Sequence, residues 1–393
     1  MLKGFSFDLT FDEAVEYFSK KGLKISYSYK DLWAGVHNKS FTVAKIMRSD
    51  LLNDLQDSLI NAMKEGKGFK EWKSNIKGTL KKYGWWGKVD ALNPKTGETK
   101  EIHVGSRRLK TIYETNVRMA YHNVRYKQAS DYEDAVYWRY NSRLLENSRD
   151  SHRKMHGIVM HRDHSFWDKN MPMCDYNCAC FLTFHTKDEC DENGWSVQTM
   201  IFPNIAKNGF DYDKRHNVWS GSSLSKIDID DSLEELPTLK EDKKYVNFSD
   251  EELKQKFFKS LGIGKEGGLF IDKIGDALHV NDELFKTGAG LSKIKKRDRH
   301  LFLTYFADLI KNPDEIYLEL EYLRKADERY TYPNHRMVKK FFKYFKNDKG
   351  KKRALIAIFT YFKDKTQGVT LHYIDTADSV EKKRIEKLIY KRE

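Results

Sequence analysis

The stretch SHRKMHGIVMHRDHSFWDKNMPMCDYNCAC, residues 151–180, is the most distinctive part of the chain. It gathers four of the 13 histidines and three of the four cysteines. Imidazole and thiolate groups bind transition metals, imidazole also transfers protons near neutral pH, and both side chains also occur in closely packed structural sites. The segment could therefore be a zinc site, a histidine-dependent metal nuclease centre, or a metal-free structural cluster.

The spacing within this stretch distinguishes the three interpretations only in part. The possible zinc ligands are Cys178, Cys180, His152, His156, Cys174 and Cys190. A Cys-x-Cys pair differs from the Cys-x-x-Cys spacing usual in zinc sites, and no matching second pair exists. The nuclease interpretation lacks an Asn/His pair on a hairpin–helix frame. We therefore expect a structural cluster without metal, in which histidines and Trp167 hold an irregular fold together by packing and hydrogen bonds.

Composition narrows the class of protein. A chain of 393 residues with 39% hydrophobic residues can form two or three globular domains. No apolar run approaches the roughly 18 residues that a membrane helix needs, and the N-terminus MLKGFSFDLTFDEAV does not resemble a signal peptide. Four unevenly spaced cysteines predict folding in a reducing cytoplasm. The net charge of +13 favours a polyanionic partner such as nucleic acid.

The part of the chain upstream of the stretch is predicted to be mostly helical. Apolar residues recur at helical spacing over 41–66, where Gly66 is a stop signal, and a second helix is expected over 106–130. Between them NPKTGE predicts a hairpin turn. We therefore assign residues 1–130 to a helical region and 131–216 to the core around the stretch.

The part of the chain downstream divides into a linker and a basic domain. Residues 217–245 are polar and aperiodic and predict a linker. Residues 246–393 hold 32 Lys and Arg and 23 Asp and Glu, which gives +9 of the total charge. The pattern predicts a capped helix from Ser249, a helix over 291–313, strands over 315–323, 353–362 and 368–374, and a helix over 379–393. The whole chain is expected to be an α+β multidomain protein, with a helix-plus-antiparallel-sheet domain at its C-terminal end.

The stretch and its flanks resemble the phage Mu-type minor head (MuF, head morphogenesis) family over about residues 8–215. The residues that carry the resemblance are Arg149, His152, His156, Gly157, Phe166, Trp167, Pro172, Asn177, Cys178, Cys180 and the segment GFDYD at 209–213. The chain departs from the family pattern at Met173 and at Ala179, where proline and arginine are usual. The resemblance implies a structural role for these residues, and a head protein that contacts the portal and other capsid proteins in the virion.

Residues 268–393 resemble a second family, the phage-borne nucleases of the barnase–EndoU–colicin–RelE class. The likeness lies in element order and in the segment KIKKRDRHLFLTYFADLIKNPDEIY. It implies a ribonuclease that needs neither metal nor other cofactor, because the 2′-hydroxyl of the RNA attacks the adjacent phosphate and leaves a 2′,3′-cyclic phosphate. Such an enzyme must remove one proton, donate another and stabilise the phosphorane charge.

Histidines and cations of the basic domain are the candidate residues for this chemistry. The predicted catalytic residues are His300, Arg299, Lys296, His372 and Arg353, and the predicted nucleic-acid-binding residues are Lys293, Arg324 and Arg329. On a helix, Lys293, Lys296 and His300 would share one face, although such a face can equally be only solvated. Lys339 is assigned to a solvated run.

The sequence thus predicts a virion protein with two functions. The first part would join the portal or procapsid, and the second would be an RNase effector, delivered to the infected cell and paired with an immunity protein. The alternatives are a structural head protein whose basic domain contacts packaged DNA and a toxin of another chemistry. An RNase effector would cleave RNA. A DNA-contacting head protein would only bind nucleic acid, and its affinity would fall strongly as the salt concentration rises.

Overall fold

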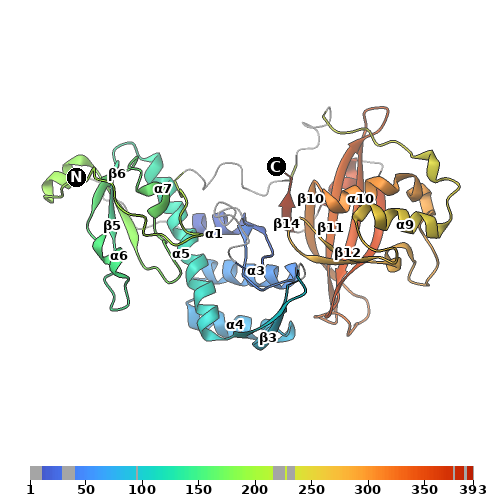
Figure 1. Ribbon diagram of the computed structural model, residues 1–393, viewed down its shortest axis with the longest axis horizontal. Coiled ribbons are helices and arrows are strands. Elements are labelled where there is room, and N and C mark those ends of the chain that lie inside the picture. The colour runs from blue at the N-terminus through green and yellow to red at the C-terminus, as the bar shows by residue number, and fades with distance from the viewer. Residues whose placement is uncertain are drawn as a thin grey trace.

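The computed structural model describes residues 11–28, 40–93, 96–215, 226–227, 235–374, 377–384 and 387–392. Figure 1 shows three bodies side by side: a small sheet with short helices, a central group of helices, and a large curved sheet that carries helices. The predicted α+β multidomain class is confirmed. Within the described ranges, no helix combines the length and the apolar character needed to cross a bilayer.

The central body is helical, as predicted. Its elements are α1 (Phe11–Ser19), α3 (Ser49–Lys64), α4 (Phe69–Lys82), α5 (Ser106–Asp131), the hairpin β3 (Gly87–Leu92) with β4 (Thr99–Val104), and the short pair β1 (Gly22–Leu23) and β2 (Ser40–Phe41). The expected helix over 41–66 begins only at Ser49, because Lys45 has φ 68° and Ile46 bridges to Ser26. Gly66, at φ 63°, ends that region as predicted.

The second body holds the opening stretch. It comprises β5 (Tyr137–Asn141), α6 (Asp150–Lys154), β6 (Val159–His161), α7 (Trp167–Asn170), β7 (Phe181–His185) and α8 (Lys187–Glu192). The strands form an antiparallel sheet in the order β6-β5-β7. The end of α5 shares its apolar core, where Trp138 and Trp167 are fully buried. This body is therefore continuous with the central one through a single long helix.

The C-terminal body is built on a seven-stranded sheet in the order β14-β10-β11-β12-β13-β9-β8. Its strands are β8 (Gly268–Ile271), β9 (Ala277–Val280), β10 (Glu315–Tyr322), β11 (His335–Lys346), β12 (Lys352–Tyr361), β13 (Thr366–Ile374) and β14 (Lys387–Lys391). Its helices are η2 (Lys243–Tyr245), α9 (Asp250–Leu261), η3 (Asp282–Phe285), η4 (Lys296–Phe302), α10 (Leu303–Lys311) and α11 (Ala377–Glu381). The capping box of Ser249 and Glu252 and the hairpin of β12 and β13 are as predicted.

Two predicted helices of this body are wrong over most of their length. The helix expected over 291–313 is α-helical only in α10, because Arg297 and Asp298 in the preceding η4 have φ values of 57° and 56°. Left-handed residues interrupt a right-handed helix. The helix expected over 379–393 is replaced by α11 and by β14, which pairs with the edge of β10 and buries Ile389. A free strand edge thus overrides local helix propensity.

Residues at the end of the predicted linker pack on the C-terminal body. The Leu239 amide donates to the Lys346 carbonyl at 2.8 Å, and Tyr245 is fully buried. Residues 216–225 and 228–234, which hold most of the predicted linker, lie outside the described residues. The chain from Glu235 onward is therefore physically part of the C-terminal body.

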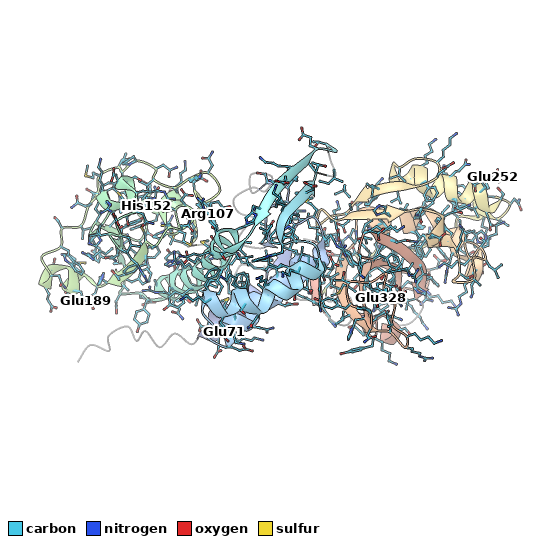
Figure 2. The ribbon with its side chains drawn as sticks, turned by 90° about the horizontal axis from the view of Figure 1, so that it is seen from below. Glu71, Arg107, His152, Glu189, Glu252 and Glu328 are labelled. Atoms are coloured by element: carbon cyan, nitrogen blue, oxygen red, sulfur yellow. The ribbon has the colours of Figure 1, made fainter. Side chains whose placement is uncertain are left out.

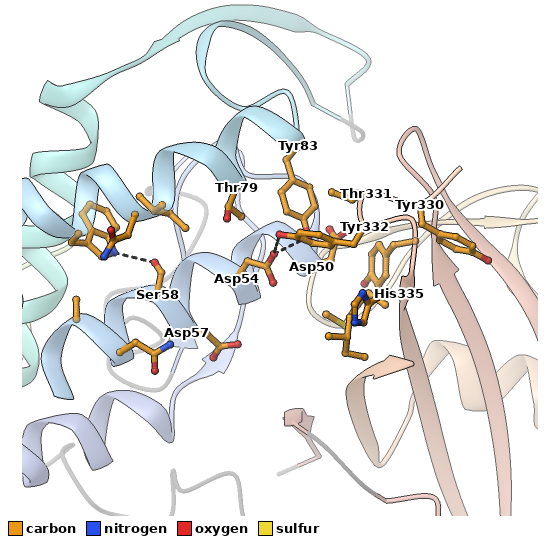
Figure 3. Close-up of a pocket in the computed structure, with 18 of the residues that line it drawn as sticks. Asp50, Asp54, Asp57, Ser58, Thr79, Tyr83, Tyr330, Thr331, Tyr332 and His335 are labelled. Carbon is orange, nitrogen blue, oxygen red and sulfur yellow. Dashed lines mark hydrogen bonds between the residues drawn. The ribbon is translucent and has the colours of Figure 1, made fainter. Parts of the chain in front are cut away.

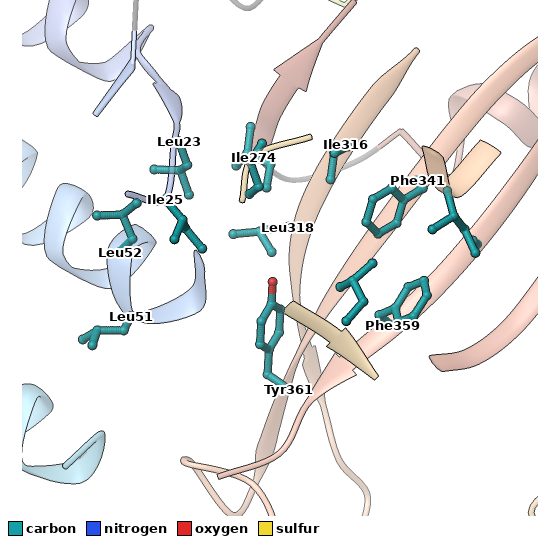
Figure 4. Close-up of a cluster of buried hydrophobic side chains, with 14 of the residues drawn as sticks. Leu23, Ile25, Leu51, Leu52, Ile274, Ile316, Leu318, Phe341, Phe359 and Tyr361 are labelled. Atoms are coloured by element: carbon teal, nitrogen blue, oxygen red, sulfur yellow. The ribbon is translucent and has the colours of Figure 1, made fainter. Parts of the chain in front are cut away.

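The central and C-terminal bodies share one apolar core. Leu23, Ile25 and Leu51 lie opposite Ile274 and Leu318 in Figure 4, and all belong to the same buried cluster. The Ile25 amide donates to the Ile274 carbonyl at 2.6 Å. Burial of such side chains contributes about 1.5–3 kcal/mol each, so this contact is a substantial interface.

Polar groups of the two bodies also meet in the interior. Ser49, the first residue of α3, donates to a carboxylate oxygen of Asp276 at 2.6 Å, and Tyr361 donates to the same oxygen at 2.5 Å. Lys339 lies 3.1 Å from Asp276 and also pairs with Asp272, and its side chain is fully buried. The expectation that Lys339 is solvated is therefore wrong, because both faces of β11 are covered at this point.

A cavity of about 540 Å³ lies beside this interface, between α3, α4 and the loop that joins β10 to β11. In Figure 3 the hydroxyls of Tyr83 and Tyr332 point to Asp54, to which they donate at 3.0 and 3.1 Å. Burial, and then the nearby Asp50, raise the pKa of Asp54 to about 6. The two tyrosine hydroxyls thus join the central and C-terminal bodies through one buried carboxyl group.

We expect the two halves to stay together after the linker is cut. Limited proteolysis should cleave within 217–234, yet the fragments should co-elute in size-exclusion chromatography because the apolar interface persists. The nicked Ile25→Asp variant should separate into two species, whereas Ile201→Asp, at an isoleucine that is 88% exposed, should not. Two separate peaks from the nicked unaltered protein would contradict the shared core.

Candidate functional site

His372 lies in the second half of β13, on the sheet face opposite α10. It is opposite Ile356 of β12 and alternates with Leu371, which packs in the core beneath α10. The pKa of His372 is lowered to about 4, mainly by burial and then by the nearby cations Arg299, Lys383, Lys293 and Arg297, in that order. His372 is therefore a neutral imidazole at pH 7 with a group of cations around it.

The segment before α10 brings three of these cations to β13. The Lys293 ammonium donates to the Val369 carbonyl at 2.6 Å, and the Lys293 amide donates to the Phe285 carbonyl at 2.7 Å. Arg299 is half-buried, and its pKa is lowered by burial and by Arg297. Burial and the neighbouring cation Arg299 also lower the pKa of Lys293. Concentrated, partly desolvated positive charge of this kind attracts a phosphate.

The structure places the predicted catalytic residues in different environments. Lys293, Arg299 and His372 lie close enough to act on one another electrostatically, and Lys296 acts on Lys293. They do not form the expected helix face, because the left-handed residues of η4 break it. His300 is buried, at 7% exposure, and its Nδ1 has no hydrogen-bond partner among the described residues. A proton donor or acceptor for RNA must be reachable by RNA, which His300 in this conformation is not.

The other predicted cations lie away from His372. Arg353 is opposite Phe345 and two residues before Leu355 in the same strand. Side chains two apart in a strand point to the same side, so Arg353 lies on the α10 face of the sheet with Leu355. Arg329 pairs with Asp327 at 2.6 Å in the loop between β10 and β11, and Arg324 is exposed in the same loop. Because Tyr322 pairs with His335, this loop lies at the opposite end of the sheet from Ile374.

Two ion pairs on the His372 face were missed by the sequence analysis. Lys340 of β11 pairs with Glu319 of β10, and Arg336 pairs with Glu321 at 2.6 Å. Lys340 is opposite Ile358, which is in turn opposite Thr370, so these residues and His372 share one face. The alternation of Glu319 and Glu321 along their strand was the available signal. The pairing of β10 with β11 is what places Lys340 and Arg336 beside these two glutamates.

The same face is covered nearer its other end. Arg384, just after α11, makes two bonds to the buried carboxylate of Glu315, at 2.8 and 2.9 Å. Arg384 also donates to the Ile227 carbonyl at 2.7 Å. Phe342 and Tyr344 pack beside this pair. Strand register places His372 in the same row as Glu315, at the border of this covered part, where it is still partly exposed; Glu319 and Thr370 lie farther along the face and are also partly exposed.

Several of the residues predicted to hold the second body together lie in its buried core or in its turns. Trp167 donates from its indole nitrogen to the His161 carbonyl at 3.0 Å and packs on Trp138 and Phe166. Gly157 and Asn177 have φ values of 85° and 59°, which the chain needs for its turns. The His156 ring accepts the Ser142 amide at 3.2 Å and lies outside the thiol cluster.

His152, Cys178 and Cys180 form a compact buried group. The His152 Nδ1 atom lies 3.6 Å from the Cys178 sulfur and 3.5 Å from the Cys180 sulfur. A hydrogen bond from Cys180, and then one from His152, lower the pKa of Cys178 against the effect of burial. Figure 2 shows His152 in the body at one end of the molecule, with Glu252 and Glu328 of the C-terminal body at the other. This group is thus remote from the His372 face.

Comparison with known proteins identifies both regions. Residues 53–183 match the family model described as Phage Mu protein F like protein, and residues 256–391 match the model described as phage-Barnase-EndoU-ColicinE5/D-RelE like nuclease2. The chain therefore joins a Mu F-like head domain to a nuclease domain of this class, and the predicted architecture is confirmed. No solved structure matches the chain.

Two curated proteins resemble part of this chain. The putative capsid assembly protein F of Escherichia phage Mu is 37% identical over 170 residues, which are 43% of this chain and 38% of that protein. The Mu-like prophage FluMu F protein of Haemophilus influenzae is 32% identical over 160 residues, which are 40% of this chain and 37% of that protein. The chain thus spans less than two fifths of either relative.

Proposed function

We propose that this protein is a head-associated phage protein whose C-terminal domain is a ribonuclease that works without a metal. The observation that carries the proposal is the match of residues 256–391 to a nuclease family, supported by Lys293, whose ammonium donates to the Val369 carbonyl three residues before His372. This match supports cleavage of nucleic acid. The likeness to a capsid assembly protein supports an association with capsid proteins, the portal among them.

The chemistry assigned to His372 is that of a general base. A neutral imidazole can accept the proton of the RNA 2′-hydroxyl, whose oxygen then attacks the adjacent phosphate. Arg299 and Lys293 would stabilise the negative charge that develops on the phosphorane oxygens. Lys383, which is exposed and acts electrostatically on His372, is our proposed donor to the leaving 5′-oxygen. The products would be a 2′,3′-cyclic phosphate and a free 5′-hydroxyl.

The biological setting follows from the joined domains. A nuclease carried in a phage head would enter the infected cell with the particle or with the DNA, and the producing cell would need protection from it. We therefore include delivery to the host and a protein that binds and blocks the nuclease, an immunity partner, in the proposal. Both are consequences of the order of domains.

Purified full-length protein should cleave single-stranded RNA in the presence of EDTA. The reason is that every group in the proposed reaction is a protein side chain or belongs to the substrate. Mass spectrometry of the fragments should detect 2′,3′-cyclic phosphate ends, and double-stranded DNA under the same conditions should stay intact. Salt-dependent binding of DNA with no cleavage of any RNA would instead favour a structural head protein with a DNA-contacting domain.

A further inference from the structure

The group formed by His152, Cys178 and Cys180 has the dimensions of a metal site. Its nitrogen and sulfur atoms all lie within 4.8 Å of one another. The three residues are 2–4% exposed. In a tetrahedral zinc site, bonds of about 2.0–2.1 Å to nitrogen and about 2.3 Å to sulfur place these atoms about 3.5–3.6 Å apart. The nitrogen–sulfur distances of 3.6 and 3.5 Å equal that separation.

Hydrogen bonding accounts for this arrangement less well than a metal does. A neutral imidazole nitrogen offers either one proton or one lone pair, so Nδ1 of His152 can form one good bond to a thiol and not two. A cation between the His152 nitrogen and the two sulfurs could be coordinated by all three atoms at once, because each can offer it a lone pair.

The surrounding chain fixes the three residues before any ligand binds. Arg149, just before α6, pairs with Asp175 at 2.8 Å and donates to the Tyr176 carbonyl at 3.1 Å. These contacts connect the start of α6 to the turn that contains Cys178. Arg118 of α5 donates to the Cys178 carbonyl at 3.2 Å. Preorganised ligands of this kind bind a metal with little loss of conformational entropy.

Cys174 is close in sequence but lies outside the group. Its sulfur donates to the carbonyls of Asn170 and Met171, at 3.2 and 3.4 Å, and burial raises the pKa of this thiol to about 12. The Cys174 sulfur is therefore directed to backbone carbonyls and is not among the atoms that group around His152. The protein therefore supplies three ligands, and a solvent molecule can complete a tetrahedron.

We propose that His152, Cys178 and Cys180 bind one zinc ion, which fastens α6 to the turn before β7. This inference reverses the expectation of a metal-free cluster and adopts the alternative that the sequence left open. Two sulfurs and one imidazole favour zinc over the oxygen-seeking cations Mg²⁺ and Ca²⁺. The site is independent of the proposed nuclease, because it lies in the body at the other end of the molecule.

The full-length protein, produced in zinc-supplemented medium and passed over a desalting column, should contain about one zinc per chain by elemental analysis. His152→Ala, Cys178→Ser and Cys180→Ser should each lower the zinc content to a small fraction of one ion per chain. The matched variants His156→Ala, Cys174→Ser and Cys190→Ser should keep the full amount, because these residues lie outside the ligand group. Zinc below about a tenth of an equivalent in the unaltered protein would overturn the proposal, as would equal loss in the matched variants.

A second measurement does not depend on whether the variants fold. Replacing zinc by Co²⁺ in the unaltered protein should produce thiolate-to-cobalt charge-transfer absorption in the near ultraviolet and intense visible bands typical of tetrahedral cobalt. Bound cobalt that lacks these bands would show that the cysteines are not ligands. Removal of the metal should lower the thermal stability of the Mu F-like region while RNA cleavage in EDTA continues, which separates this inference from the proposed function.

Discussion

His372→Ala should lower the rate of RNA cleavage by about 10²–10⁴-fold, the usual contribution of a general base. The fold should survive, because His372 is partly exposed. His335→Ala is the matched control, because this histidine packs against Tyr322 at the opposite end of the sheet. Cleavage should be measured with a fluorogenic RNA under single-turnover conditions, and circular dichroism should verify folding. Equal effects of the two substitutions would remove His372 from the mechanism.

The pH dependence of cleavage provides an independent check on His372. The base must be neutral, so kcat/KM should fall only as the pH drops through the folded pKa of about 4, well below the ordinary histidine value near 6.5. Arg299→Ala should move this acid limb upward, because a cation that disfavours protonation is lost. The shift should be partial, since burial is the larger cause of the low pKa. An acid limb at 6.5 in the unaltered protein would contradict the environment described for His372.

Lys339→Ala should destabilise the protein strongly, by about 3–5 kcal/mol, as expected when one partner of a buried ion pair is removed. Asp272 and Asp276 would be left buried without their cation. Asp276 also accepts from Ser49, so the contact between the central and C-terminal bodies should weaken as well. Urea unfolding followed by tryptophan fluorescence would measure the change.

The control for this experiment is Lys349→Ala. Lys349 is exposed in the turn between β11 and β12, so its loss should change the unfolding free energy by no more than about 0.5 kcal/mol. A Lys339→Ala protein as stable as the Lys349→Ala protein would mean that the buried pair contributes nothing. An inactive Lys339→Ala enzyme should be attributed to unfolding, since Lys339 lies on the α10 face and not on the His372 face.

The sequence was informative wherever local periodicity agreed with the final fold. The alternation in β12 and β13 predicted a hairpin, and the capping box before α9 predicted a helix start, because both signals depend on neighbouring residues alone. It failed at η4 and β14. There, contacts with β13 and with the free edge of β10 outweigh the helical tendency of Lys- and Arg-rich segments.

The candidate site was predictable in its residue types and only partly in its members. Lys293, Arg299 and His372 were chosen because imidazole and cations suit phosphate chemistry, and the fold does bring them together. Arg353 and Arg329 were chosen by the same logic, and strand register places them elsewhere. The ion pair of Glu319 and Lys340 could not be anticipated, since it joins two strands whose alignment no local pattern specifies.

By itself the sequence determined that this protein joins a Mu F-like head domain to a basic domain of a nuclease class, because ordered motifs and charge are properties of the chain. The tertiary structure alone decided which side chains meet. It buries Lys339 between two aspartates, keeps His372 neutral among cations, and sets His152 at metal-binding distance from Cys178 and Cys180. Burial and charge proximity depend on distances through space, and residues far apart in a chain acquire those distances only when it folds.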